Sequence, residues 1–260
     1  MNYKIKKVSI SIVIYKNYSE VLKAIDSIKK YTSDSINLRI FLIDNSATES
    51  QDKKNFLKKI EKYSDVLYFS MQKNVGFGRA HNSILPSLNS DLHIIMNPDI
   101  VFFEDTILKI IEFMDKNLDI GMVIPKLVDQ SNQLEDVYRR NPTVFDMFIR
   151  FFHLKFFKKR LEYHNMHDED FSKPFRVPFG QGSFLAIRTN VFTRIHGFDE
   201  RYFMYMEDAD LCRRVNEISK LMYFPGTSVY HKWEKGSHKN FHLFRIHVKS
   251  MAKYFIKWGI

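Results

Sequence analysis

Apolar segments rich in β-branched residues alternate with segments of helical periodicity along the first hundred residues. Strands are predicted at residues 8–15, 38–44, 66–70 and 91–96, and helices at residues 19–31, 51–62 and 76–88. This alternation predicts an α/β fold with a mostly parallel central sheet and helices on both faces. Ligands of such sheets bind beyond the carboxyl ends of the strands, so the residues that follow each strand are candidate site residues.

Polar residues and glycines follow three of the predicted strands. Asp44 and Asn45 follow the second strand, and Gly76 lies in the segment NVGFG after the third. Asn97 and Asp99 follow the fourth. Because the carboxyl ends of parallel strands meet at one edge of a sheet, we expect these residues to lie close together.

The segment Asn97-Pro98-Asp99 is a candidate cation site. Pro98 restricts Asn97 to an extended conformation and ends the strand, so the Asp99 carboxylate is expected to point into a cleft. A hard oxygen ligand there suits Mg²⁺ or Mn²⁺, which proteins bind through one or two carboxylates plus substrate phosphates. An ordinary turn is the alternative, because Asn, Pro and Asp are all good turn residues.

Acidic and aromatic residues are interleaved between residues 197 and 214. Glu207, Asp208 and Asp210 follow the apolar segment FMYM at the start of a predicted helix, where first-turn acids are the ordinary alternative. Three carboxylates are more than a helix start needs, and removal of a proton from a hydroxyl requires a base within hydrogen-bond reach. We predict Asp208 as this base and Glu207 as a further catalytic candidate, with Glu207 or Asp210 holding the acceptor or the arginine pair that follows.

His231 is a candidate metal ligand. The chain contains ten histidines, and a lone histidine is more often structural than a ligand. His231, however, ends a strand-like segment and precedes a Lys- and Gly-containing loop at residues 232–238. This position predicts that one ring nitrogen binds a metal while the loop covers a diphosphate.

Charge and composition restrict the partners. Forty Lys and Arg against thirty Asp and Glu give a net charge of +10, which favours polyanions. Nucleic acid is not expected, because the acids cluster at predicted strand ends and no helix-turn-helix or zinc-finger spacing is present. A dinucleotide-dependent enzyme is disfavoured, since the segment GFG lacks the third glycine of the fingerprint and follows the third strand. The single Cys212 excludes an internal disulfide and indicates a reducing, cytoplasmic compartment.

Two basic, aromatic segments, at residues 143–160 and 241–258, are predicted to form amphipathic helices. Each either lies on an anionic membrane surface or packs on the protein core, and packing is favoured for the C-terminal one. No apolar run approaches the roughly 20 residues of a spanning helix, so any membrane contact is expected to be peripheral, at the inner face of the plasma membrane.

Several motifs in order resemble family 2 of the inverting glycosyltransferases, and most closely its bacterial rhamnosyltransferase branch. They are ISIVIYKN, LIDNSATES, NVGFGRAHN, MNPDI, GQGSFLAIRTNVF, GFDERYFMYMEDADLCRRV and VYHKWEKGS. The resemblance implies a GT-A fold, with a Rossmann-like sheet and a smaller acceptor-side lobe. It also implies that Asp44 and Asn45 contact the nucleotide, and that Gly76, Arg79 and Asn82 line the donor site.

The same resemblance places Asn97 and Asp99 where the family usually has Asp-x-Asp. The first acid is therefore Asn here, which leaves Asp99 and His231 as the expected ligands of Mn²⁺ or Mg²⁺. Asp208 falls on the family's catalytic aspartate. The implied donor is dTDP-rhamnose, with a UDP-hexose as the alternative, and the implied acceptor is a saccharide, free or carried on polyprenyl diphosphate. Asn97 keeps a catalytically inactive, sugar-nucleotide-binding homologue as a second possibility.

Four segments are expected from these assignments. Residues 1–140 form a nucleotide-sugar-binding lobe, and residues 141–175 form a variable basic and aromatic segment. Residues 176–240 form the acceptor and catalytic lobe, and residues 241–260 form a C-terminal amphipathic helix.

Overall fold

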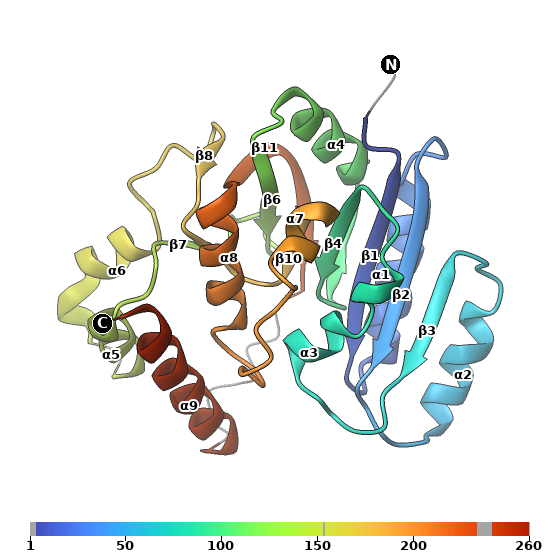
Figure 1. Cartoon of the computed structure of the whole chain (residues 1–260), viewed down its shortest axis with the longest axis horizontal. Coiled ribbons are helices and arrows are strands. Elements are labelled where there is room, and N and C mark those ends of the chain that lie inside the picture. The colour runs from blue at the N-terminus through green and yellow to red at the C-terminus, as the bar shows by residue number, and fades with distance from the viewer. Residues whose placement is uncertain (1–3, 153, 233–240, 260) are drawn as a thin grey trace.

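The computed structural model describes residues 4–152, 154–232 and 241–259, in which a central sheet of nine strands forms the middle layer (Figure 1). The strand order is β3-β2-β1-β4-β10-β6-β11-β5, and β8 pairs with β11. The strands are β1 Lys7–Ile14, β2 Asn37–Asp44, β3 Val66–Ser70, β4 Leu92–Met96, β5 Ile100–Val101, β6 Ile120–Val128, β8 Phe175–Arg176, β10 Phe184–Arg188 and β11 Lys220–His231.

The first four strands of this order run parallel, and their apolar runs explain why. Ile10 of β1 pairs with Ile40 of β2 on one side and with Ile94 of β4 on the other, and all three side chains are fully buried. Such continuous burial is typical of a parallel strand with helices on both faces. β10 is antiparallel to β4 and β6, whereas β6 and β11 are again parallel. The predicted α/β fold with a mostly parallel sheet is confirmed.

Helices cover both faces of the sheet (Figure 1). One face carries α1 Tyr18–Tyr31, α2 Gln51–Ile60 and α4 Thr106–Lys116, and the other carries α3 Phe77–Asn82, α7 Thr189–Arg194 and α8 Glu207–Ile218. Side-chain caps fix two of the helix starts: Ser50 accepts from the Lys53 N–H at 3.1 Å, and Asp105 accepts from the Leu108 N–H at 3.1 Å. Each satisfies a backbone donor that the first helical turn leaves unpaired.

Two segments of the chain are divided into shorter elements. The helix expected at residues 76–88 is divided into α3 and the 3-10 turn η1 Leu85–Ser87, because Pro86 cannot donate the backbone hydrogen bond that continues an α-helix. The stretch from 175 to 188 forms three separate short strands, β8, β9 Phe179–Gly180 and β10. Pro178 and Gly182 mark the divisions, and each piece pairs with a different strand.

A smaller lobe packs beside α8 (Figure 1). It contains the short ribbon of β7 Tyr138–Arg139 with β9, the helices α5 Val144–Phe151 and α6 Lys158–His164, the turn η2 Lys155–Phe157 and the C-terminal helix α9 Phe241–Trp258. α5 and α9 contact each other, since the rings of Phe151 and Phe244 lie 5.4 Å apart. None of the helices in the described ranges is long and apolar enough to cross a membrane. The functional division into four segments stays a prediction.

Candidate active site

The proposed base lies at the start of α8, directly after a strained turn. Tyr205 and Met206 both adopt positive φ, at 70° and 69°, which is rare for non-glycine residues and is concentrated at functional sites. This turn directs Asp208 toward the 180–183 segment, where its Oδ2 accepts from the Gly182 N–H at 3.1 Å. Its Oδ1 accepts from the Ala209 N–H at 2.8 Å. The half-buried carboxylate is thus held in one orientation.

The pKa of Asp208 is raised by burial, although these two N–H groups and the charge of Arg139 pull it down. A raised pKa makes a carboxylate a stronger base, and general bases work best when their pKa approaches the working pH. Asp208 therefore has both the fixed geometry and the proton affinity that deprotonation of a hydroxyl requires.

Glu207 differs from its neighbour. Its side chain is buried and its Oε2 has no hydrogen-bond partner among the described residues. Burial, and then the charge of Asp208, raise the pKa of Glu207 to about 8. The raised pKa favours the neutral form of Glu207, whereas two backbone N–H groups fix the orientation of Asp208, so the assignment of the base to Asp208 stays a prediction.

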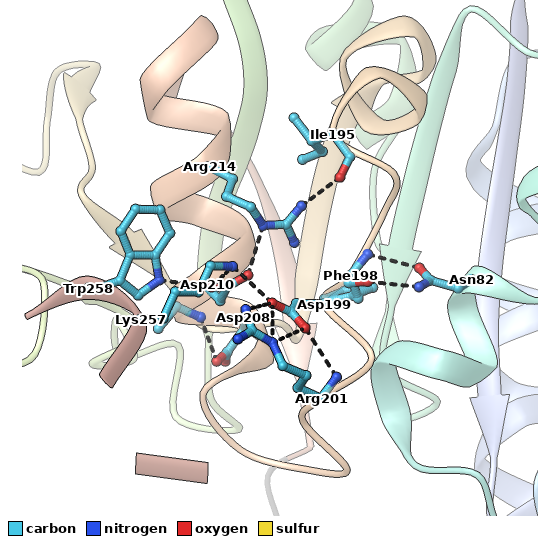
Figure 2. Close-up of polar contacts among 11 residues, drawn as sticks. Asn82, Ile195, Phe198, Asp199, Arg201, Asp208, Asp210, Arg214, Lys257 and Trp258 are labelled. Carbon is cyan, nitrogen blue, oxygen red and sulfur yellow. Dashed lines mark hydrogen bonds and ion pairs between the residues drawn. The ribbon is translucent and has the colours of Figure 1, made fainter. Parts of the chain in front are cut away.

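Asp210 is a structural residue (Figure 2). It is fully buried, and its carboxylate accepts from Arg214 Nε and from Trp258 Nε1, both at 2.8 Å. Lys257 lies 2.6 Å from the same carboxylate. The predicted pairing of an acid in this turn with the arginine pair is confirmed for Asp210 and Arg214, and the contacts with α9 were not foreseen.

Asp99 and His231 come together at the carboxyl ends of the strands, as a cation site requires. His231 Nε2 lies 3.6 Å from Asp99 Oδ2, and Asp99 Oδ1 is buried without a hydrogen-bond partner in the described ranges. His231 Nδ1 lies 2.6 Å from Glu135 Oε2. Burial lowers the pKa of His231, but Asp99 and Glu135 outweigh it and raise this pKa to about 9.

These residues fit a divalent cation that also uses substrate oxygens. Within the described part of the chain, no group of three or more His, Cys, Asp or Glu side chains is arranged to hold a metal. Mg²⁺ and Mn²⁺ sites with one or two protein ligands are completed by phosphates and water. Glu135 would orient His231, as carboxylates commonly orient metal-bound histidines. Sequence reasoning missed Glu135, whose surroundings carry no motif.

Asn97 lies beside this pair and is half-buried. Its backbone N–H donates to the Ser183 carbonyl at 2.9 Å, and its carbonyl accepts from the Ile100 N–H at 3.3 Å. Its side-chain amide makes no hydrogen bond to the residues that the structure describes. The amide is thus available to a ligand at the end of β4.

Asp44 and Asn45, at the end of β2, have different surroundings. The fully buried Asp44 carboxylate accepts from the Tyr18 hydroxyl at 3.0 Å and from the Tyr68 hydroxyl at 2.6 Å. Asn45 Nδ2 donates to the Gly76 carbonyl at 3.0 Å, while its buried Oδ1 has no partner in the described ranges. The Asp44 carboxylate is thus used in contacts within the protein, whereas the side-chain oxygen of Asn45 is able to accept a hydrogen bond from a ligand. Nucleotide contact by either residue stays a prediction.

Gly76 permits a close approach of two chain segments. Its φ is +88°, and a Cβ there would lie 2.1 Å from the Phe203 carbonyl oxygen. That oxygen accepts from the Phe77 N–H at 3.1 Å. Only glycine tolerates both the positive φ and the contact.

Arg79 and Asn82, on α3, are joined through Glu200. Arg79 Nε donates to Glu200 at 2.9 Å, and Asn82 Nδ2 lies 3.3 Å from the same carboxylate. Asn82 also exchanges two 2.8 Å hydrogen bonds with the backbone of Phe198 (Figure 2). Its amide therefore holds the segment that leads to α8, and a donor contact by Asn82 or Arg79 stays a prediction.

Residues 9–195 match the model of Glycosyl transferase family 2. This chain belongs to that family. Among curated relatives, this family 2 glycosyltransferase is 28% identical over 188 residues to rhamnosyltransferase WbbL of Escherichia coli (strain K12), covering 72% of this chain and 69% of that protein. It is 26% identical over 206 residues to N-acetylglucosaminyl-diphospho-decaprenol L-rhamnosyltransferase of Mycobacterium tuberculosis (strain CDC 1551 / Oshkosh), covering 74% of this chain and 66% of that protein.

Solved structures support the fold of the family 2 glycosyltransferase. GalNAc-T7 with UDP, GalNAc and Mn²⁺ superposes with a TM-score of 0.72 at 16% identity, over 99% of this chain and 49% of that one. A mannosyltransferase of Pyrobaculum calidifontis with GDP-Man and Mn²⁺ gives 0.64 at 15% identity, over 100% of this chain and 69% of that one. The expected GT-A fold and the rhamnosyltransferase-like resemblance are confirmed.

Proposed function

We propose that this glycosyltransferase moves rhamnose, with inversion, from dTDP-rhamnose to a hydroxyl of a saccharide carried on polyprenyl diphosphate. The observation that carries the proposal is the Asp208 carboxylate, which Gly182 and Ala209 hold at the start of α8 with a raised pKa. The names of the two bacterial relatives support rhamnose as the sugar, and the decaprenol in one of them supports a lipid-linked acceptor.

In this mechanism Asp208 accepts the proton of the acceptor hydroxyl as that oxygen attacks the anomeric carbon. The bond from this carbon to the nucleotide diphosphate breaks on the opposite side, which inverts the configuration. Asp99 and His231 would hold a Mn²⁺ or Mg²⁺ ion, which neutralises charge on the departing diphosphate when bound. The raised pKa of Glu207 favours its neutral form, which keeps a second negative charge away from Asp208.

The substitution Asp208→Asn tests the base. It keeps the shape and the acceptor oxygen of the side chain but removes its proton affinity, so turnover should fall by about 10²- to 10⁴-fold. The thermal shift produced by the nucleotide should stay unchanged. Asp119→Asn is the matched control, since Asp119 is exposed and pairs with Lys220 at the amino ends of β6 and β11. Near-normal turnover in Asp208→Asn would refute the assignment.

A panel of sugar nucleotides tests the donor. With Mn²⁺ present, dTDP-rhamnose should raise the melting temperature more than UDP-hexoses do, because a ligand that binds only the folded state stabilises it. A larger shift by a UDP-hexose would replace rhamnose with the alternative donor. Binding of a donor without transfer to any acceptor would favour the inactive homologue, which the Asn97 substitution in the family motif keeps open.

A lipid-linked acceptor requires contact with a membrane, and one surface suits it. Exposed phenylalanines gather on α5 and directly after it, on η2 and on α9. We call this set of side chains the aromatic patch: Phe145, Phe148, Phe152, Phe156, Phe241 and Phe244. Apolar side chains next to basic ones, as on η2 and α9, favour the surface of anionic lipid. We expect the chain to float with vesicles that contain phosphatidylglycerol, and salt to weaken this binding.

Substitution of the aromatic patch checks this contact. Phe148→Ser with Phe152→Ser should release the chain from the vesicles, whereas Leu118→Ser, at an exposed site outside the patch, should not. Equal flotation of both proteins would exclude the patch as the membrane surface.

A further inference from the structure

Two arginines near Asp208 form no ion pair with the residues that the structure describes. Arg139 lies on β7, and its Nη2 donates to the Asp136 carbonyl at 2.9 Å, but its Nε is buried without a partner. Arg150 lies on α5 and is half-buried, and its guanidinium makes no hydrogen bond or ion pair with any residue that the structure describes. A partly buried charge is costly unless an opposite charge compensates it.

Both guanidinium groups lie within electrostatic reach of Asp208. β7 pairs with β9, so that Arg139 is opposite Phe179, three residues before the Gly182 N–H that binds Asp208. Burial lowers the pKa of Arg139 to about 9, the charge of Arg150 adds to this, and Asp208 and Asp136 oppose it. Burial likewise lowers the pKa of Arg150, with Asp208 first among the acids that oppose it. The two cations therefore repel each other beside the base.

The nearby acids Asp136 and Asp146 offset this repulsion only in part, because each has another partner. Asp136 pairs with His167 at 2.6 Å, and Asp146 pairs with Arg160 at 2.6 Å. His164 is buried, and neither of its ring nitrogens has a hydrogen bond in the described ranges. Burial lowers the pKa of His164 to about 4, so His164 adds no charge at neutral pH.

Two other arginines of the same lobe, Arg140 and Arg160, form ion pairs with carboxylates. Arg140 makes two 2.8 Å hydrogen bonds to the two oxygens of Asp168, in the paired geometry that a guanidinium prefers. Arg160 binds both oxygens of Asp146. Arg139 and Arg150 thus differ from Arg140 and Arg160, because neither forms an ion pair. Two such guanidinium groups suit a ligand with several anionic oxygens.

We propose that Arg139 and Arg150 bind the phosphate groups of the acceptor while its sugar hydroxyl faces Asp208. The inference rests on the proposed function, because it assumes a sugar diphosphate as acceptor. The acceptor is favoured over the donor because β7 and α5, which carry the two arginines, lie in the smaller lobe beside α8, whereas Asp99 and His231 lie at strand ends of the central sheet. α5 carries both Arg150 and Phe148 of the aromatic patch, so one helix would contact phosphate and lipid.

Binding of inorganic pyrophosphate, measured by calorimetry in EDTA, tests the anion site without any sugar. Without a cation, the Asp99 carboxylate repels pyrophosphate, so the arginine pair should dominate binding. Arg139→Gln and Arg150→Gln should each weaken it at least tenfold, and Arg140→Gln, with the same change of charge one residue away, should leave it unchanged. Equal binding by all four proteins, or none by the wild type, would overturn the proposal.

The melting temperature separates a binding role from a structural one. Since the two cations repel each other in the free protein, Arg150→Gln should keep or raise the melting temperature without ligand. Pyrophosphate should raise the melting temperature of the wild type and of Arg140→Gln but not of Arg150→Gln. If Arg150 were instead structural, its substitution would lower the melting temperature of the free protein, and that result would contradict the anion site.

Steady-state kinetics distinguish acceptor from donor. With a synthetic sugar diphosphate bearing a short lipid, both substitutions should raise the KM for the acceptor at least tenfold and leave the KM for the donor unchanged. An increase confined to the donor KM would reassign the arginines to the donor diphosphate and overturn the proposal. If the wild type binds pyrophosphate at the arginines but transfers no sugar from any donor, the proposed function fails and the anion site stands.

Discussion

The indole Nε1 of Trp258 donates a 2.8 Å hydrogen bond to Oδ1 of Asp210 and so ties the C-terminal helix to the first turn of α8 (Figure 2). Asp210 is fully buried and lies two positions after Asp208. Lys257 pairs with the same carboxylate and also with Asp199, at 2.9 Å. The helix turn that carries the proposed base, Asp208, is therefore held by a helix that lies far from it in the sequence.

Asp210→Ala should lower the free energy of unfolding by roughly 3 kcal/mol, because removal of one partner from a buried ion pair leaves the other uncompensated. Urea denaturation measures this. Asp119→Ala provides the comparison, since the Asp119–Lys220 pair is exposed and should change stability little. Similar losses in the two variants would contradict a structural role for Asp210.

Gly76→Ala should destabilise the chain by about 2–3 kcal/mol and weaken donor binding, because a Cβ meets the Phe203 carbonyl in addition to the strain of positive φ. Gly259→Ala separates the two effects. Gly259 has a similar φ of +83°, but nothing lies within 4 Å of its Cβ position. Thermal denaturation of both variants should show the larger loss for Gly76→Ala, and equal losses would exclude the contact as the cause.

The raised pKa of Glu207 predicts that the free energy of unfolding depends on pH. Its pKa is about 8 in the folded chain against an ordinary value of 4.5, so between these pH values the folded state binds a proton that the unfolded state lacks. The contribution of Glu207 to the free energy of unfolding is then fully present below pH 4.5 and falls as the pH rises to about 8. Asp208 and Tyr205 face this carboxyl and remain in the variant.

Glu207→Gln should therefore gain stability relative to the wild type from pH 5 to pH 8 and hold a constant difference above that. Urea denaturation at a series of pH values measures the difference. Glu169→Gln, which removes one charge at a more exposed acid, is the comparison for the change in net charge. A difference between Glu207→Gln and the wild type that does not vary with pH would refute the raised pKa.

Glu135→Gln should weaken activation by Mn²⁺ by about 10- to 100-fold, because the neutral amide no longer supports His231 as a ligand. The Mn²⁺ concentration at half-maximal turnover measures the effect. Excess Mn²⁺ should restore most of the activity, which a damaged fold would not allow. An unchanged Mn²⁺ dependence would remove Glu135 from the cation site.

The strand ends illustrate what local patterns predict well. The apolar run before Asp44 and the Pro98 after β4 fix the positions of Asp44, Asn97 and Asp99 at one edge of the sheet, because a parallel strand has only one carboxyl end. The helix start at Glu207 was likewise visible from its acids. Pro178 and Gly182 separate β8, β9 and β10, but no local pattern shows which strand each of these short pieces pairs with.

The sequence by itself determined the α/β class, the cleft edge and the candidate base, because periodicity and motif order are properties of neighbouring residues. Only the tertiary structure placed Glu135 against His231, Trp258 against Asp210, and Arg139 with Arg150 beside Asp208. These contacts join residues that lie far apart in the chain. Their burial and charge come from the packing of separate elements, which no local pattern contains.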